Sequence, residues 1–546
     1  MSRLEIASPK RAKIVMEGLY KDLERRIESS PPGLCPVDMA RAFLELCHAQ
    51  TCGKCVPCRI GLGQLNNFIR EVLDGKATMK TLDIMEQTAL SIMESADCAI
   101  GYEAANMVYK GLIGYRDDYI EHIQNGRCTC TYNQPVPCVS LCPAHVDIPG
   151  YIALVGEGRY ADAIRLLRKD NPFPTTCGFI CEHPCEARCR RNMVDDSINI
   201  RGLKRVAADF AGEVDPPQCA PSTGKKIAIL GGGPGGLSAA YYLQLMGHQT
   251  TVYEMLPELG GMLRYGIPNY RLPKERLDDD IRAILKTGVQ VKNGLKIGQD
   301  ITIQELRQQY DVVLITIGAS TDKKLGLENE DADGIISAVQ FLRNVGKNQI
   351  IDLTGKEVVV IGGGNVSMDA VRTAKRLGAK KVSIVYRRRV ADMTALPGEI
   401  EGAVAEGIEL QTLKAPASID VDENHHVKGI YVTPQMVSSI RDGRASIKPT
   451  GEEDIYIPCD VLIVAIGQNI ETHHFEQAGI PVERGKIITK STGAFENLPG
   501  VFAGGDCASG PASVIKAIAA AKVVAANIDE YLGYHHEISC DVEIPE

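Results

Sequence analysis

Cysteine residues give the first indication of chemistry in this chain. Twelve of the 18 cysteines lie between Cys52 and Cys189. The first four combine a C-x₂-C-x₂-C run with one remote member, and they are Cys52, Cys55, Cys58 and Cys98. This spacing suits a [4Fe–4S] cluster, because one loop supplies three thiolates and a second element supplies the fourth. Zinc is the alternative, since four thiolates also suit a tetrahedral zinc ion.

Eight further cysteines follow, which are enough for two more clusters. They are Cys128, Cys130, Cys138, Cys142, Cys177, Cys181, Cys185 and Cys189. In a large chain that begins without an apolar signal core, clustered cysteines indicate metal ligands or redox groups rather than disulfides. The sequence therefore predicts two or three [4Fe–4S] clusters in the N-terminal part.

A glycine-rich turn indicates the first nucleotide site. Residues 231–236 read GGGPGG, follow an apolar run and precede a helical pattern. Gly231 allows the tight turn, Gly233 lets the backbone approach a pyrophosphate, and Gly236 lets helix and strand pack closely. An acid at the end of the next expected strand can accept hydrogen bonds from a ribose diol. The residues expected to touch this dinucleotide are Gly231, Gly233, Pro234, Gly235, Gly236 and Glu254.

A second glycine-rich turn follows the apolar run 357–361 and repeats the same unit. Its expected binding residues are Gly362, Gly364, Asn365 and Val366. The next expected strand ends in Arg387 and Arg388 and carries no acid. Arginines favour the 2′-phosphate of NADP through charge-assisted hydrogen bonds, whereas an acid would favour NAD. The alternative for these arginines is a solvated basic strand end.

The C-terminal part indicates a flavin. Residues 500–506 read as a strand that runs into Gly505 and Asp506, and an alanine-rich helix follows. In this fold class such an acid and the helix N-terminus meet the ribityl chain and the pyrophosphate of the flavin. We therefore expect FAD at the first turn and NADP(H) at the second.

The elements that position these residues change in character along the chain. The fold class expected is multidomain, with N-terminal all-α iron–sulfur domains before α/β, Rossmann-like FAD- and NADPH-binding domains. The expected segments are a helical [4Fe–4S] domain at 1–125, a helical iron–sulfur domain at 126–220, an FAD domain at 221–345 and 466–546, and an NADPH domain at 346–465.

Bulk composition limits the function classes. Hydrophobic residues make up 44% and charged residues 24%, as in an ordinary globular protein. The net charge of −9 disfavours a nucleic-acid-binding protein. No apolar run is long enough to span a bilayer, so we expect a cytoplasmic protein that does not associate with membranes.

From about residue 126 the chain resembles the small subunit of glutamate synthase. It is also similar to the NADPH-binding large subunit of ferredoxin-dependent transhydrogenases and to the N-terminal part of dihydropyrimidine dehydrogenase. The matching segments include CPAHVDIPGYIALV, GGGPGGLSAAYYL, VVVIGGGNVSMDAVRTA and GVFAGGDCASGPASVIKAI. The resemblance implies an NADPH domain inserted in an FAD domain. It also implies that Gly260 to Leu263, with Gly261 among them, run along the flavin, and that Glu399 lies near the nicotinamide as a catalytic residue.

The segments TCGKCVPCRIGLGQL and ADCAIG resemble the C-terminal cluster domain of the NADH-binding flavin subunit of respiratory complex I. The FMN and NADH parts of that subunit have no counterpart in this chain. The resemblance therefore implies a cluster domain without its own flavin, whose cluster faces a partner protein.

For the second cysteine set, the family resemblance implies one cluster on Cys128, Cys130, Cys138 and Cys189. It implies that Cys142, Cys181 and Cys185 contribute to another. The family pattern at the start is C-x₂-C-x₄-C-x₃-C, but this chain reads C-x-C-x₇-C-x₃-C. Lys204 stands where the family has a Gln or Glu ligand, and a protonated lysine cannot bind iron. Either Cys177 takes that place, or the ligand assignment differs, or one cluster is lost.

These features favour a subunit that moves electrons between NADP(H), FAD and [4Fe–4S] clusters. We expect a hetero-oligomer with partner subunits that carry flavin or iron–sulfur centres, ferredoxin being one candidate. The whole assembly would be an NAD(H)/NADP(H) transhydrogenase, with electron bifurcation as an option. The alternative enzyme is an electron donor to an amidotransferase, as in glutamate synthase. A thioredoxin reductase-like enzyme is disfavoured because residues 346–465 hold only Cys459, and a non-catalytic adaptor is disfavoured by the intact nucleotide motifs.

Overall fold

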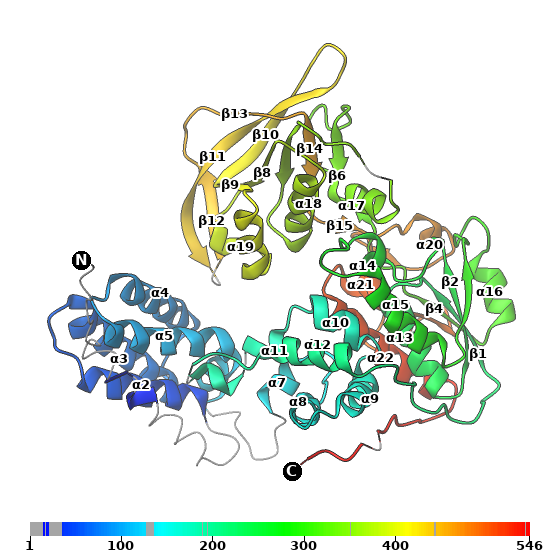
Figure 1. Ribbon diagram of the computed structural model, residues 1–546, viewed down its shortest axis with the longest axis horizontal. Coiled ribbons are helices and arrows are strands. Elements are labelled where there is room, and N and C mark those ends of the chain that lie inside the picture. Colours follow the sequence, from blue (N-terminus) through cyan, green and yellow to red (C-terminus); the bar gives the residue numbers. More distant parts are fainter. Residues whose placement is uncertain are drawn as a thin grey trace, which may run out of the picture. The chain divides into compact units, whose positions relative to one another are not determined.

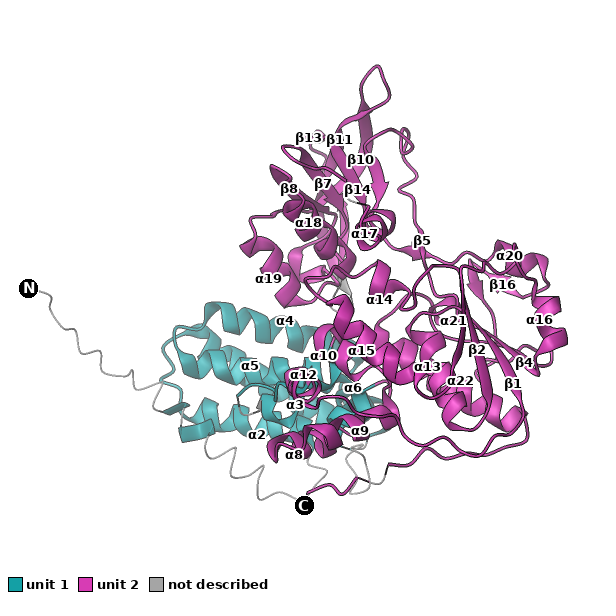
Figure 2. Cartoon of the chain, turned by 45° about the vertical axis from the view of Figure 1, so that its right-hand side comes forward, with its two compact units in different colours: residues 1–142, 183–200 teal, residues 143–182, 201–546 magenta. Residues whose placement is uncertain are grey.

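The computed structural model describes residues 15–16, 18–20, 35–126, 136–187, 189–193, 195–349, 351–441, 444–540 and 542–545. It divides into two units, which Figure 2 colours separately. Unit 1 comprises residues 1–142 and 183–200, and unit 2 comprises residues 143–182 and 201–546. The stretch 126–220, which we expected to form one domain, therefore contributes to both units.

Unit 1 is helical. Its longer helices are α2 (Pro36–Ala49), α3 (Leu62–Leu73), α4 (Met79–Ser95), α5 (Ala99–Gly114) and α6 (Arg116–Asn125). Its short elements are η1 (Pro57–Gly61), α7 (Pro137–Leu141), α11 (Pro184–Ala187) and η2 (Arg190–Met193). Apolar residues at helical spacing, such as Leu62, Leu65, Ile69 and Val72 on α3, are fully buried in its core.

Unit 2 begins with a small helical part, α8 (Ile148–Gly156), α9 (Tyr160–Asp170), α10 (Pro174–Ile180) and α12 (Ile200–Phe210). Helix α10 packs on α15 (Lys274–Leu285), and the contact is polar as well as apolar. The fully buried carboxylate of Asp280 accepts hydrogen bonds from the backbone nitrogens of Thr175 (3.2 Å) and Thr176 (2.7 Å). These are orphan donors of the first helical turn, so Asp280 caps α10 from another element.

The first α/β part of unit 2 is a parallel sheet in the order β18-β4-β1-β2-β3. Its strands are β1 (Lys226–Leu230), β2 (Gln249–Glu254), β3 (Gln290–Asn293), β4 (Val312–Ile315) and β18 (Val501–Ala503). Its helices are α13 (Pro234–Leu245), α14 (Met262–Tyr265), α15, α16 (Ile303–Gln309), α20 (His473–Gln477), α21 (Asp506–Ser509) and α22 (Val514–Tyr531). Helices α13 and α22 pack together (Figure 1). Strand β4 is wholly buried, as expected for a parallel strand covered on both faces.

A second parallel sheet has the order β6-β14-β7-β8-β9. Its strands are β6 (Ile335–Ser337), β7 (Glu357–Ile361), β8 (Lys381–Tyr386), β9 (Glu409–Thr412) and β14 (Val461–Val464). Its helices are α17 (Ala338–Gly346), α18 (Asn365–Arg376), η3 (Val390–Asp392) and α19 (Pro397–Ala405). Edge strand β6 thus lies ahead of residue 346, where we expected this domain to begin.

Antiparallel strands extend the second half. They are β10 (Lys414–Val421), β11 (Val427–Arg441), β12 (Arg444–Pro449) and β13 (Ile455–Pro458). A hairpin, β16 (Val482–Glu483) with β17 (Lys486–Ile487), lies in the first half. Two short strands, β5 (Thr321–Asp322) and β15 (Gln468–Asn469), pair antiparallel where the chain passes between the two parallel sheets. The inserted half is therefore entered and left at one place.

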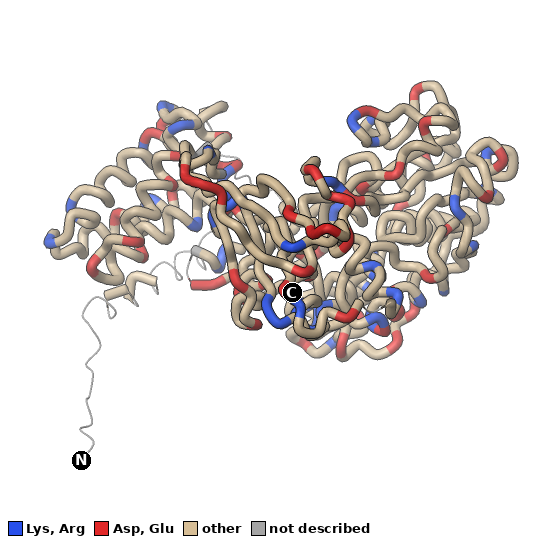
Figure 3. Tube along the Cα trace, turned by 90° about the horizontal axis from the view of Figure 1, so that it is seen from above, with Lys and Arg blue, Asp and Glu red and all other residues tan. Residues whose placement is uncertain are grey.

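Charged residues of both signs are interspersed along the described trace (Figure 3). No described helix combines the length and the apolar character needed to cross a membrane.

We predict that Asp280→Asn destabilises the protein. The amide leaves one of the two buried backbone donors facing an NH₂ group, which costs about 1–3 kcal/mol. We expect the apparent melting temperature, followed by flavin release, to fall by roughly 2–8 °C. The neighbouring Asp279→Asn is the control, because the ion pairs of Asp279 among the described residues are with Arg276 and Arg282 near the surface. Equal melting of the two variants would contradict the capping role of Asp280.

Candidate functional site

The first cysteine set comes together in unit 1. Cys58, which is 3% exposed, lies on the single π-helical turn η1, and Cys98 is the N-cap residue of α5. Burial and a hydrogen bond with Cys55 raise the pKa of the Cys58 thiol to about 12, and the nearby thiols of Cys98 and Cys52 add to the rise. Thiols packed this closely cannot all ionise without a cation, because their negative charges repel one another. Iron ions would compensate the charge of the thiolates. These four residues fit a [4Fe–4S] cluster.

The space around Cys58 is fixed by a glycine. A Cβ atom at Gly101 would lie 2.6 Å from Sγ of Cys58. Gly101 belongs to α5, the helix that begins after Cys98, so α5 approaches η1 closely at this point. Cys52 is exposed, which leaves one side of the set open to solvent.

The second cysteine set is distributed over both units. Cys128 and Cys130 lie outside the described residues. In unit 1, burial raises the pKa of the Cys138 thiol, and the nearby thiols of Cys189 and Cys142 add to the rise. The backbone nitrogen of Ile198 donates to Sγ of Cys189 (3.5 Å). Hydrogen bonds to cysteine sulfurs help to set the reduction potential of an iron–sulfur cluster. Cys185 is buried in the same unit.

In unit 2, Cys177 and Cys181 are neighbours on and just after α10. Their mutual hydrogen bond, together with burial, raises the pKa of Cys177 well above its usual value, and the charge of Lys204 opposes this. Lys204 is 6% exposed, and its Nζ lies 5.9 Å from the ring centre of Tyr151. The residue that replaces the family's Gln or Glu thus lies beside Cys177, the cysteine that we considered as a substitute ligand.

The residues predicted to bind FAD line one cavity. They are Gly231, Gly233, Pro234, Gly235, Glu254, Gly261, Gly505 and Asp506. The remaining two, Gly236 and Leu263, are buried beside it. A Cβ atom at Gly236 would lie 1.9 Å from the carbonyl oxygen of Gly231, so only glycine lets α13 start so close to β1. Gly233 is the N-cap of α13 and supplies no side-chain cap, which leaves the first N–H groups free for a pyrophosphate.

Glu254 and Arg343 border this cavity with groups suited to FAD. The Glu254 carboxylate accepts hydrogen bonds from the backbone nitrogens of Gly232 (2.7 Å) and Leu256 (2.8 Å), and burial raises its pKa. Arg343 donates through Nη2 to the carbonyl oxygen of Ser320 (2.6 Å), while its buried Nε has no partner among the described residues. This unpaired donor suits an oxygen of the cofactor. No sequence motif marks Arg343, because α17 approaches the FAD cavity only through the fold.

The residues predicted to bind NADP(H) line a second cavity of about 1070 Å³. They are Gly362, Gly364, Asn365, Val366, Arg387 and Arg388. Gly364 is the N-cap of α18 and again supplies no side-chain cap. Asn365 fixes the turn, because its Oδ1 accepts from the Leu396 nitrogen (3.0 Å) and its Nδ2 donates to Glu182 (3.2 Å). Glu182 follows Cys181, so the cysteine segment and the nucleotide turn of unit 2 are joined directly.

The arginine run after β8 is not uniform. Arg389 is held by Asp392, with Nε–O and Nη2–O distances of 2.9 and 3.0 Å, and this pair lowers the pKa of Asp392 to about 2. Arg388 donates through Nε to the carbonyl oxygen of Ala445 (3.0 Å), and Asp392 accepts from the Ala445 nitrogen (2.9 Å). The hairpin of β11 and β12 thus orients Arg388, while Arg389 is already paired.

Glu399, predicted to be catalytic, has both carboxylate oxygens in ion pairs. Nε of Arg271 lies 3.1 Å from one oxygen, and Nη1 of Arg372 lies 2.7 Å from the other. Arg271 also pairs with Asp369 at 2.7 Å, and burial raises the pKa of Asp369 to about 6 while Arg271 opposes this. Glu399 is therefore suited to positioning, and its catalytic role stays a prediction.

The ion pairs of Arg271 join the two halves of unit 2. Arg271 precedes α15 of the FAD half, whereas Asp369 and Glu399 lie on α18 and α19 of the NADP half. The adjacent Tyr270 ring lies under the guanidinium of Arg376, 3.9 Å from its Cζ. Arg271 is only 11% exposed. Sequence reasoning missed this contact, since nothing in the local pattern links residue 271 to residues 369 and 399.

Family models match three parts of the chain. The model for pyridine nucleotide-disulphide oxidoreductases matches residues 225–521, which is more than half of the chain. The chain belongs to the pyridine nucleotide-disulphide oxidoreductase family. The model for the NADH-ubiquinone oxidoreductase-F iron-sulfur binding region matches residues 38–122, and that for dihydropyrimidine dehydrogenase domain II with its 4Fe-4S cluster matches residues 114–215.

Several curated relatives align with most of this chain. The NADP(+)-dependent formate dehydrogenase subunit beta of Moorella thermoacetica is 32% identical and covers 90% of the chain and 79% of its own length. The NADPH-Fe(3+) oxidoreductase subunit beta of Geobacter sulfurreducens is 34% identical, with coverages of 92% and 79%. The glutamate synthase [NADPH] small chain of Escherichia coli is 34% identical, with coverages of 72% and 88%. Among solved structures, FprA of Mycobacterium tuberculosis matches with a TM-score of 0.50 at 21% identity, covering 57% of this chain and 85% of its own.

These findings confirm the resemblance, the fold class and the cofactors predicted from the sequence. The family member is an oxidoreductase with FAD, NADP(H) and [4Fe–4S] clusters. The iron–sulfur model that covers Cys52, Cys55, Cys58 and Cys98 favours iron over zinc at that set. Which residues hold each cofactor remains a prediction that the geometry above supports.

We predict that Arg271→Ala both destabilises unit 2 and slows electron uptake from NADPH. The buried carboxylate of Asp369 loses its cation and the partly buried Glu399 loses one of two, which costs about 3–5 kcal/mol. We expect the apparent melting temperature to fall by roughly 6–15 °C and flavin reduction in stopped flow to slow by about tenfold or more.

Arg282→Ala is the matched control, because Arg282 is 65% exposed and its ion pair within the described part of the chain is with Asp279. This control should reduce flavin at the wild-type rate. If Arg271→Ala does so as well, the ion pairs do not position the two halves.

Proposed function

We propose that this chain is the NADP(H)-dependent subunit of a multi-subunit NAD(H)/NADP(H) transhydrogenase, with ferredoxin as a further electron carrier and bifurcation as its mode. The observation that carries the proposal is the joining of two nucleotide cavities and two kinds of cluster-binding segment in one chain. The bound groups would supply hydride exchange between nicotinamide and flavin and single-electron transfer through the clusters.

The residues of the chain bind and orient these groups. Gly231, Gly233 and Gly236 bring the start of α13 to the FAD pyrophosphate, with Glu254 beside the ribose and Asp506 at the ribityl chain. Burial raises the pKa of Asp506, as expected for an acid in a closed cavity. At the second cavity, Gly362 and Gly364 bring α18 to the NADP pyrophosphate. Arg387 and Arg388 bind the 2′-phosphate.

Two observations favour partner subunits. The two relatives that span most of the chain are named as beta subunits, of a formate dehydrogenase and of an NADPH-Fe(3+) oxidoreductase. The exposed Cys52 opens the first cysteine set to the surface, where electrons can pass to another protein. The alternative, an electron donor to an amidotransferase, is supported by the 34% identity to the glutamate synthase small chain. That relative matches 72% of this chain, whereas the two beta subunits match at least 90%.

The test begins with anaerobic purification and measurement of flavin, iron and sulfide per polypeptide. We expect about one FAD and about 8–12 irons per chain, two or three clusters of four. NADPH should bleach the flavin much faster than NADH. With its co-expressed partner subunits, the chain should then couple NADPH to NAD⁺ or ferredoxin reduction. Glutamate formation instead would establish the alternative, and zinc in place of iron would end the electron-transfer proposal.

A second prediction separates Arg388 from Arg389. Arg388→Gln should lower the ratio of kcat/KM for NADPH over NADH by about tenfold or more, since a charge-assisted phosphate contact is worth about 1.5–3 kcal/mol. Arg389→Gln is the matched control and should change this ratio less than about threefold, because Asp392 already occupies Arg389. Inhibition by 2′,5′-ADP against 5′-AMP gives an independent readout. A larger change for Arg389→Gln than for Arg388→Gln would contradict the assignment of the 2′-phosphate contact to Arg388.

A further inference from the structure

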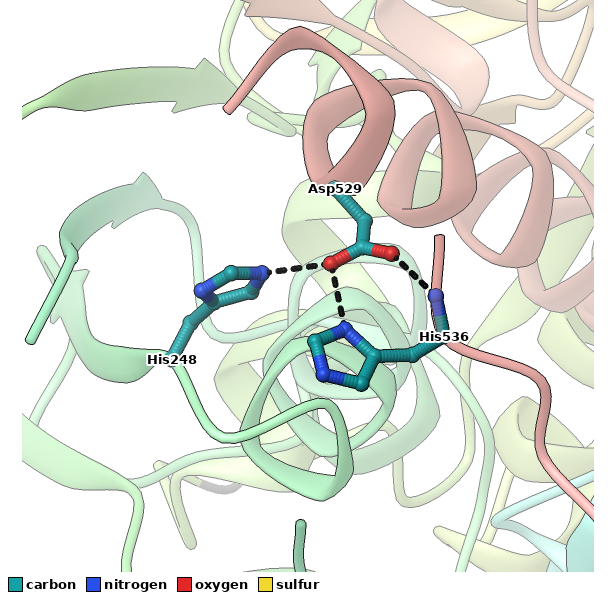
Figure 4. A group of neighbouring side chains, drawn as sticks. All are labelled: His248, Asp529 and His536. Atoms are coloured by element: carbon teal, nitrogen blue, oxygen red, sulfur yellow. Dashed lines mark hydrogen bonds and ion pairs between the residues drawn. The ribbon is translucent and has the colours of Figure 1, made fainter. Parts of the chain in front are cut away.

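A buried side-chain cluster lies where the C-terminal tail meets the FAD half. His248 precedes β2, Asp529 lies near the end of α22, and His536 lies in the segment that follows (Figure 4). Nε2 of His248 is 2.9 Å and Nδ1 of His536 is 2.8 Å from the same carboxylate oxygen of Asp529. The side chain of His248 is fully buried, that of Asp529 is 2% exposed and that of His536 is 27% exposed. The nucleotide and iron–sulfur sites do not use these residues.

The charge of Asp529 lacks a permanent counter-ion. In the part of the chain that the structure describes, its ion-pair partners are the two histidines, and no lysine or arginine lies within 4.0 Å. Although burial raises the pKa of this carboxylate, three hydrogen bonds, from His248 and from the ring and backbone nitrogens of His536, favour its charged form and lower the pKa. Neutral imidazoles supply no positive charge, so the buried negative charge attracts a cation, either a metal ion or a proton on one of the rings.

The surroundings of His248 allow its Nε2 to be a metal ligand. Oγ1 of Thr223 lies 2.7 Å from Nδ1 of His248 and 3.2 Å from the carbonyl oxygen of Gly247. When the Thr223 hydroxyl donates to Gly247, it can accept the Nδ1 proton of His248. In that tautomer the Nε2 lone pair faces the Asp529 carboxylate oxygen at 2.9 Å, and a metal ion can bind both atoms.

We propose that His248, Asp529 and His536 bind a divalent first-row transition-metal ion, for which zinc is the probe. The donor atoms all lie within 4.8 Å of one another, a spacing that zinc, with bonds of about 2.0–2.1 Å to histidine and carboxylate, can bridge after small shifts. Thr223 lies within hydrogen-bond distance of the other nitrogen of His248 (2.7 Å), as a group that orients a metal-bound histidine does. Two histidines and a carboxylate leave a fourth position for water. His536 borders a cavity of about 530 Å³, through which solvent reaches the site.

Metal binding would hold the C-terminal tail against the FAD half of unit 2. The backbone nitrogen of His536 donates to the second Asp529 oxygen (2.7 Å), and the Tyr534 ring stacks on the His536 ring with centroids 5.6 Å apart. An ion bound by the residue before β2, by α22 and by His536 would therefore oppose release of the tail, residues 534–540. Occupancy is thus coupled to protection of the tail from proteolysis.

The test compares the full-length holoprotein with three variants. His536→Ala removes one ligand at the most accessible position, and Asp529→Asn removes the charge while keeping the shape. His535→Ala is the matched control, because this adjacent histidine is exposed and outside the cluster. Each protein is dialysed against micromolar zinc and then buffer, and zinc, iron and flavin are measured per chain. Digestion of the tail by a serine carboxypeptidase is followed with and without zinc.

We expect wild type and His535→Ala to retain about one zinc more per chain than the other two variants, at equal flavin and iron. Zinc should slow tail digestion about tenfold in those two proteins only. Equal zinc content in all four proteins would overturn the proposal. Tail protection that depends on pH but not on zinc would also overturn it, and would assign the counter-charge to a protonated histidine.

Discussion

The two nucleotide-binding halves of this oxidoreductase depend on a buried guanidinium. Arg271 lies between Asp369 and Glu399, and Arg372 pairs with both Glu399 and Glu406, so cations and carboxylates alternate in a largely buried group. Such a group tolerates little displacement, because loss of one partner leaves an unpaired buried charge. An arginine contacts both carboxylates through the five donors of its planar, rigid fork, whereas a lysine offers a single nitrogen without a fixed plane. The start of α18, where NADP(H) is expected, is thereby fixed relative to the glycine segment at Gly261.

Helix N-termini show how the fold reserves places for cofactors. Helix α16 begins with a capping box in which Thr302 and Glu305 satisfy its first donors. Helices α13 and α18 begin at Gly233 and Gly364 and have no such cap. The unpaired Nε of Arg343 adds another donor at the first of these cavities. The starts of α13 and α18 also lie at the two glycine turns that line the cavities, where the phosphates of a dinucleotide would accept from their donors.

The sequence predicts the parts of this structure that depend on local spacing. Both β–turn–α units, the glycine turns and the Cys52–Cys58 loop follow from short motifs, and the structure brings their residues together. Contacts across the fold left no local signal. Arg343 carries no motif, nothing around Arg271 links it to Asp369 or Glu399, and the difference between Arg388 and Arg389 depends on Asp392 and on a hairpin more than fifty residues away. The second cysteine set departs from the family spacing, and Cys128 and Cys130 lie outside the described residues.

The pairing of β5 with β15 has an architectural consequence. The chain leaves the first sheet after β4 and returns to it after β14 through two strands that are hydrogen-bonded to each other. The ends of the inserted half therefore lie side by side, the condition under which one domain can be placed inside another without disturbing its host. The first sheet closes through pairing of β18 with β4, whatever the insert contains. The NADP half is thus a cassette whose exchange during evolution would change the electron donor, and the flavin cavity would then lose only what α17 contributes to it, Arg343.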